Sequence, residues 1–133
     1  MHKTIRANLA DSAAQMSEAD FAFRPAPEVR SFGQLVGHVI NANYFFCSQA
    51  AGEKYPVTAN YETNSDRTTL VMALQESLSY CDRIYEATTD ANFNQSVTMA
   101  PQPGAPTPTT VRGAVLMFNV THNNEHYGNL GAC

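Results

Sequence analysis

Two histidines near the end of the sequence are spaced for binding one metal ion together. They stand in the stretch HNNEH, as His122 and His126, with Glu125 directly before the second. Residues four apart lie on one face of a helix, about 5–6 Å from each other at the base, so both imidazoles can reach the same ion. A bound divalent ion can lower the pKa of a coordinated water or thiol and stabilise a developing anion.

The order H-x-x-E-H also matches the motif of one class of zinc protease. That class takes its third ligand, a glutamate, from further along the chain. The residues that follow here, Tyr127 to Cys133, include no Asp, Glu or His, so we expect the third ligand upstream and reject the protease interpretation. Glu125 then has two open interpretations: a proton carrier, or a carboxylate that is either solvated or orients an imidazole.

His38 is the histidine that can complete the set. It lies within QLVGHVI, and at about 100° per residue it falls on the same helix face as Leu35, Ala42 and Phe45. The remaining histidine, His2, is expected at a mobile terminus. The metal site is therefore predicted at His38, His122 and His126, with Zn²⁺ favoured and Ni²⁺ or Fe²⁺ also suited. The alternative is three core histidines that only form hydrogen bonds.

Four stretches with helical periodicity position these residues: 3–17, 31–52, 65–88 and the segment after Thr109-Thr110. Their apolar stripes are Ile5, Leu9, Ala13 and Met16; Leu35, Val39, Ala42 and Phe46; Leu70, Leu74, Leu78, Cys81 and Tyr85; and Val111, Val115, Phe118 and His122. Four helices with one apolar face each pack best as one bundle. We predict an all-α four-helix bundle, with residues 1–133 forming one domain.

The connecting segments carry turn and loop signals. Ser17 and Asp20 can cap a short turn, and Phe21 and Phe23 are expected to pin an extended segment to the bundle. Ser31 and Gly52 are typical first and last caps of the second helix. The prolines at 101, 103, 106 and 108 predict an extended surface loop before the last helix.

Composition excludes several classes of partner. The chain has 133 residues and a formal charge of −4 without a run of Lys or Arg, which argues against nucleic-acid binding. No apolar stretch approaches the length of a membrane span, and the polar N-terminal residues do not resemble a signal peptide. Cys47, Cys81 and Cys133 do not match a disulfide framework or a metal knuckle, so we expect small apolar residues in a reducing cytoplasm.

The pair of stretches SFGQLVGHVINANYFFC (31–47) and LMFNVTHNNEHYGNL (116–130) resembles the DinB/YfiT-like superfamily of metalloenzymes. The resemblance implies an antiparallel four-helix bundle that holds one divalent ion through His38, His122 and His126. Characterised members of the family include transferases and isomerases that use low-molecular-weight thiols. The resemblance therefore also implies a small-molecule substrate, a thiol cofactor and a homodimer.

Three functions stay open at this point. The first is a metal-dependent enzyme of the small-thiol S-transferase, isomerase or hydrolase type, with its catalytic residues unassigned. The second is a non-catalytic bundle that binds a metal or small molecule for sensing or stress response. The third is an interaction protein with an obligate dimer interface. Several polar residues could bind the ring nitrogens or line the pocket, or could be surface and packing residues: Asn41, Asn123, Asn124, Asn129, Tyr44 and Tyr127.

Overall fold

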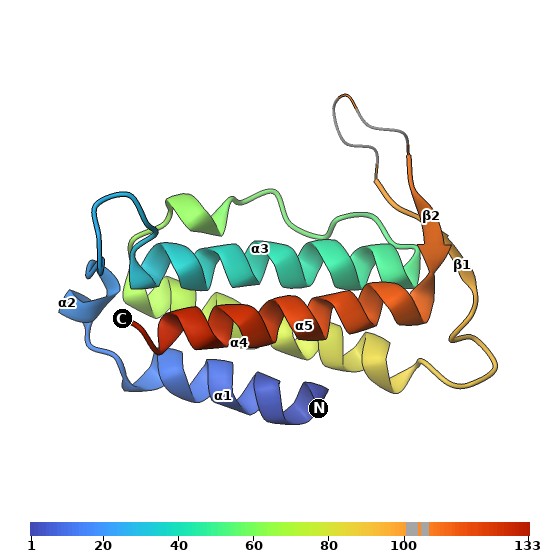
Figure 1. Ribbon diagram of the computed structural model, residues 1–133, viewed down its shortest axis with the longest axis horizontal. Helices are drawn as coiled ribbons and strands as arrows, with labels where there is room; N and C mark the ends of the chain where they lie inside the picture. Colours follow the sequence, from blue (N-terminus) through green and yellow to red (C-terminus); the bar gives the residue numbers. More distant parts are fainter. Residues whose placement is uncertain (101–103, 105–106) are drawn as a thin grey trace.

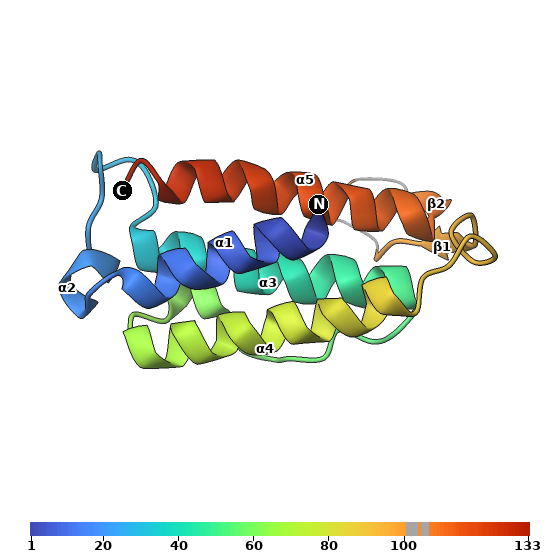
Figure 2. The same ribbon diagram turned by 90° about the horizontal axis from the view of Figure 1, so that it is seen from below.

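Four long helices pack side by side in the computed structural model, which describes residues 1–100, 104 and 107–133 (Figure 1). They are α1 (His2–Gln15), α3 (Phe32–Ala51), α4 (Arg67–Glu86) and α5 (Arg112–Leu130). Seen from below, α1 lies in front of α3, and α4 and α5 flank the pair on either side (Figure 2). The predicted all-α four-helix bundle is confirmed.

Successive long helices along the chain alternate in direction, except that α4 follows α3 in the same direction. α3 and α4 run the same way, because residues 52–66 return along the outside of α3 before α4 begins (Figure 1). α1 and α5 run in the opposite direction and so lie antiparallel to both. The returning segment contains the short 3₁₀ helix η1 (Tyr61–Thr63), which packs against α3. α3 thus lies between α4, α5 and η1.

Capping residues fix where α3 begins and ends. The Gln34 N–H donates to the Ser31 hydroxyl, and the Ser31 N–H donates to the Gln34 side chain, which completes a capping box. At the other end Gly52 adopts a left-handed φ of 70°, which glycine accepts without strain. Ser17 and Asp20 form the same box at α2 (Glu18–Phe21). The predicted caps of both segments are confirmed.

A small antiparallel ladder precedes α5. β1 (Ser96–Thr98) pairs with β2 (Thr109–Val111), and Ser96 lies opposite Val111. The prediction that Val111 belongs to the last helix is therefore wrong, because its backbone joins the ladder and the helix begins at Arg112. Val97 is buried and anchors the ladder to the core. The predicted proline loop falls largely on 101–103 and 105–106, which lie outside the described residues.

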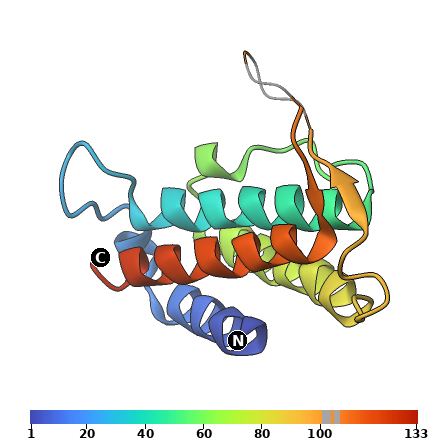
Figure 3. The same ribbon diagram turned by 45° about the vertical axis from the view of Figure 1, so that its right-hand side comes forward.

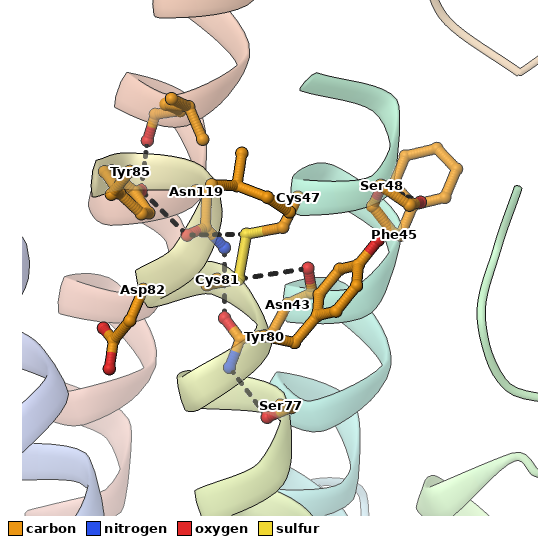
Figure 4. Close-up of a disulfide and its surroundings, with 12 residues drawn as sticks. Asn43, Phe45, Cys47, Ser48, Ser77, Tyr80, Cys81, Asp82, Tyr85 and Asn119 are labelled. Atoms are coloured by element: carbon orange, nitrogen blue, oxygen red, sulfur yellow. Dashed lines mark hydrogen bonds between the residues drawn. A yellow bond between two sulfur atoms is a disulfide. The ribbon is translucent and has the colours of Figure 1, made fainter. Parts of the chain in front are cut away.

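The core consists of two apolar clusters with polar side chains between them. One cluster joins all four long helices, and the smaller one lies where α3 and α4 end and α5 begins. Between them Asn43 donates to Ser77 Oγ at 3.2 Å and accepts from Asn119 at 3.1 Å and Asn123 at 2.8 Å. All four residues are buried, so this polar layer links α3, α4 and α5 at mid-height (Figure 4).

Cys47 and Cys81 form a disulfide between α3 and α4 beside the polar layer (Figure 4). The sequence interpretation of this pair as small apolar residues is wrong. The two positions are 34 residues apart, but the parallel course of α3 and α4 brings their Cα atoms within 5.4 Å. The cysteine spacing consequently gives no support to a reducing compartment. Cys133 is a free thiol.

Two further predictions need correction. Phe118 was expected to face inward, but it is 58% exposed and its ring packs on Phe46 at 5.1 Å, because Val115 and Asn119 occupy the inner face of α5. His2 is not at a free terminus. It begins α1, stacks on Tyr85 at 3.8 Å and contacts an Asp82 oxygen at 2.7 Å.

Within the described residues, no helix combines the length and apolar character that crossing a membrane requires.

Candidate metal centre

The three predicted histidines meet at the seam between α3 and α5. His122 Nε2 lies 3.2 Å from His38 Nε2 and 3.1 Å from His126 Nε2. One ring nitrogen of each residue lies within 4.8 Å of the other two. The i, i+4 spacing on α5 brings two of the rings together, and the antiparallel packing of α3 supplies the third. All three side chains are half-buried.

Two of the three nitrogen–nitrogen distances, 3.2 and 3.1 Å, fit the spacing of ligands around a divalent ion. Metal–nitrogen bonds of about 2.0–2.1 Å in a tetrahedral site place neighbouring ligand nitrogens roughly 3.3 Å apart. Without a cation the same contacts are hard to satisfy, because an N–H···N bond needs one protonated and one bare nitrogen. His122 Nε2 carries either one hydrogen or one lone pair, yet it faces a nitrogen on each side. An ion would accept the lone pairs of all three rings.

The protein environment keeps two of the rings neutral. Burial, together with the nearby His126 and His38, lowers the pKa of His122 to about 4. Burial, followed by the proximity of His38, also lowers the pKa of His126 below its usual value. Since neutral imidazole is the form that binds metals, both rings are ready to act as ligands at neutral pH.

The outer nitrogens of the three rings have different surroundings. His38 Nδ1 lies 3.2 Å from Glu62 Oε2, and His126 Nδ1 lies 3.3 Å from Asn129 Nδ2. His122 Nδ1 is buried and has no hydrogen-bond partner among the described residues, and the same holds for Asn123 Oδ1. Unpaired buried polar atoms are uncommon in proteins, and their occurrence here sets the seam apart from the rest of the core.

Glu62 is the contact that sequence reasoning missed. It belongs to η1, in a segment without apolar periodicity, so no spacing signal connects it to His38. One carboxylate oxygen contacts His38 Nδ1 and the other accepts from Arg30 Nε. Burial raises the pKa of Glu62, but the hydrogen bonds from Arg30 and His38 outweigh that effect and lower the pKa below its usual value. The carboxylate is thus ionised at neutral pH.

The amides predicted near the histidines have different roles. Asn41 does not bind a ring nitrogen; it holds η1 by accepting from the Tyr61 N–H. Asn123 belongs to the polar layer, and Asn129 is the amide that contacts His126. Asn124 is exposed on α5.

The other predicted side chains lie away from the histidine rings. Glu125 is exposed and has no side-chain hydrogen bond within the described part of the chain, which agrees with the solvated interpretation. Tyr44 is 6% exposed, packs on Tyr80 and lines a pocket with residues of α4, not a groove at the histidines. Tyr127 lies on the surface of α5.

Open grooves reach the histidines from two sides. One, of about 500 Å³, has walls that are mainly apolar and aromatic beside the two histidines and one amide; its lining residues are His38, His122, Asn41, Ala42, Phe45, Phe46 and Tyr55. The other, of about 620 Å³, reaches His126 and includes Arg30 and Cys133. A ligand could therefore approach the histidine cluster from the aromatic side or from the more polar side.

Comparisons with known proteins agree with this architecture. The family model of the DinB superfamily matches residues 1–130. A DinB-like protein from Bacillus cereus superposes with a TM-score of 0.77 at 13% identity, covering 96% of this chain and 81% of that one. A comparison with curated protein sequences finds no match.

A second solved structure with a similar fold is that of an enzyme. A variant of the mycothiol-dependent maleylpyruvate isomerase superposes with a TM-score of 0.74 at 14% identity, covering 99% of this chain. The isomerase itself gives a TM-score of 0.70 at 15% identity. The chain spans 58% and 57% of these two chains, and identities at this level show a shared fold. Because the family model spans nearly the whole sequence, the chain belongs to the DinB superfamily.

Proposed function

We propose that His38, His122 and His126 hold one divalent ion, Zn²⁺ in the first place, and that the protein is a metal-dependent enzyme acting on a small molecule. The observation that carries the proposal is the convergence of three ring nitrogens within 4.8 Å, two of the pairs at about ligand spacing, beside an open groove. When bound, such an ion lowers the pKa of a coordinated thiol or water. Ni²⁺ and Fe²⁺ suit the same three imidazoles.

The reaction class we favour is thiol transfer or isomerisation with a low-molecular-weight thiol. Support comes from the fold shared with an isomerase that depends on mycothiol. The groove walls formed by Phe45, Phe46 and Tyr55 would bind the apolar part of a substrate and exclude water from the reacting atoms. Hydrolysis, with water in place of the thiol, is the related alternative. A second copy of the chain remains the proposed protein partner.

One observation favours a non-catalytic bundle as the second candidate. Glu125 is exposed, and Glu62 contacts the outer nitrogen of His38, on the side away from the other histidines. Neither carboxylate is placed to move a proton at the ion. Incubation of the metal-loaded protein with a panel of electrophiles and several cellular thiols separates the candidates. Turnover above the metal-free control supports an enzyme, and its absence across the panel supports a sensing or structural role.

Metal analysis of protein purified without an affinity tag tests the site itself. We expect about one ion per chain in the native protein and a loss of that ion in His38→Ala, because two imidazoles hold a divalent ion far more weakly than three. His2→Ala is the matched control, since His2 contacts Asp82 and stacks on Tyr85, both on α4, whereas the three histidines lie on α3 and α5. Absence of metal from the native protein, or equal content in both variants, would contradict the proposal.

A further inference from the structure

The short helix η1 is held unusually close to α3 directly beside His38. A Cβ atom added to Gly37 would overlap the carbonyl group of Tyr61 and would lie 2.7 Å from the Glu62 nitrogen. Any larger residue at position 37 would push η1 away from the helix. Glycine therefore has a specific role at this position, which is to let η1 approach α3 one residue before the histidine.

Asn41 secures η1 one helical turn beyond Gly37. Its Oδ1 accepts from the Tyr61 N–H at 3.1 Å, and its Nδ2 donates to Asn60 Oδ1 at 2.7 Å. Asn60 Oδ1 in turn accepts from the Glu62 N–H at 3.1 Å and caps η1. The backbone N–H groups of Tyr61 and Glu62 are thus tied, directly or through Asn60, to the helix that carries His38.

The Glu62 side chain is fixed from two directions. Arg30 Nε donates to Oε1, and Oε2 lies 3.2 Å from His38 Nδ1. An ionised carboxylate only accepts hydrogen bonds, so His38 must donate through Nδ1. A neutral imidazole has one hydrogen, and its placement on Nδ1 leaves a lone pair on Nε2. Nε2 is the atom that faces His122 at 3.2 Å.

We propose that Glu62 is the positioning residue for His38: its carboxylate holds the ring hydrogen on Nδ1 and so directs the Nε2 lone pair toward the ion position. This inference rests on the proposed metal site and deepens it. A carboxylate behind a ligating imidazole also fixes the ring orientation and raises the basicity of the ligand nitrogen. Arg30 then acts on the site indirectly, by holding the carboxylate in place.

Glu62→Gln is the sharpest test, because the substitution keeps the shape and reverses the hydrogen bonding. Arg30 can only donate, so it would take the amide oxygen and leave the amide NH₂ facing His38 Nδ1. The ring would then accept at Nδ1 and carry its hydrogen on Nε2, where it blocks the metal. We expect a switch of the His38 tautomer in long-range ¹H–¹⁵N spectra of metal-free protein at pH 8. Zinc affinity in a chelator competition should fall tenfold or more.

Two other variants complete the design. Glu53→Gln is the matched control, since Glu53 also accepts from an arginine, Arg83, and from a second side chain, Tyr80. It should change neither the tautomer nor the zinc affinity. Glu62→Ala leaves Nδ1 to water and should give a mixture of tautomers with an intermediate affinity. It also replaces Glu62→Gln as the test variant if circular dichroism shows that the latter does not fold.

The readouts separate this inference from the proposed function. The tautomer is measured without metal, so it reports on Glu62 even if the native protein fails to bind zinc, a result that would overturn the metal site alone. The positioning role is overturned if His38 keeps its hydrogen on Nδ1 in both Glu62 variants. A zinc affinity within twofold of the Glu53→Gln control would overturn it equally.

Discussion

Burial determines the charge of the histidine cluster before any ion binds. Three imidazoles whose Nε2 atoms lie this close repel one another when protonated, and the half-buried seam adds a desolvation cost for each charge. His122, the central ring, is affected most, with its pKa lowered to about 4. The same features that prepare the rings for a metal therefore destabilise the metal-free protein in mild acid.

The first prediction concerns the pH dependence of folding. The His122 imidazole titrates near 6.5 in the unfolded chain and near 4 in the folded one, so between these values the unfolded state binds more protons. The stability of the metal-free protein should be fully present above about pH 6.5 and should fall as pH drops through 4. Urea midpoints at pH 7.5 and 4.5 measure this loss. His122→Gln should show a smaller loss, and an equal loss would contradict the assignment.

At the site, sequence reasoning identified the residues whose spacing carries information. His122 and His126 are a helical pair, and His38 shares an apolar helix face with Leu35 and Ala42, so a convergence of the three could be expected. Glu62 could not be predicted in this way. Its contact with His38 depends on how the returning segment, residues 52–66, packs over Gly37, and no local sequence pattern encodes that packing.

Among the elements, α3 connects every other part of the site. It carries His38, it contacts η1 through Gly37 and Asn41, and it is joined to α4 by the disulfide from Cys47. Its bounds were predictable because Ser31 and Gly52 cap it locally. The disulfide was not predictable, because it depends on α3 and α4 running parallel. The returning segment, residues 52–66, determines that direction, and the spacing of the cysteines does not.

The second prediction concerns the Cys47–Cys81 bridge. It closes a loop of 34 residues in the unfolded chain, and cross-links of this kind typically contribute about 2–4 kcal/mol by restricting that state. Replacing both cysteines by alanine should lower the free energy of unfolding by roughly this amount in urea titrations. Zinc binding should persist, because the histidines join α3 to α5 and not to α4. Cys133→Ser is the control and should change little.

For the whole molecule, the division of the core raises the question of whether it unfolds as one unit. The two apolar clusters are separated by a polar layer, but within this layer Asn43 donates to Ser77 and accepts from Asn119, which ties the helices together. The ladder of β1 and β2 lies at the end of the bundle near the smaller cluster, and the C-terminus of α5 lies at the opposite end (Figure 3). The predicted single domain requires both clusters to lose structure together.

The last prediction joins this cooperativity to the metal site. The chain has six tyrosines and no tryptophan, so tyrosine fluorescence and circular dichroism at 222 nm provide two independent probes of thermal unfolding. Both should give one coincident transition. Because zinc would bind the folded state alone, a free zinc concentration of 100 times the Kd should stabilise that state by about 2.7 kcal/mol. Both unfolding curves should then move together to higher temperature. His38→Ala should show no such shift. Separate transitions for the two probes would contradict a single domain, and a shift retained in His38→Ala would place the zinc elsewhere.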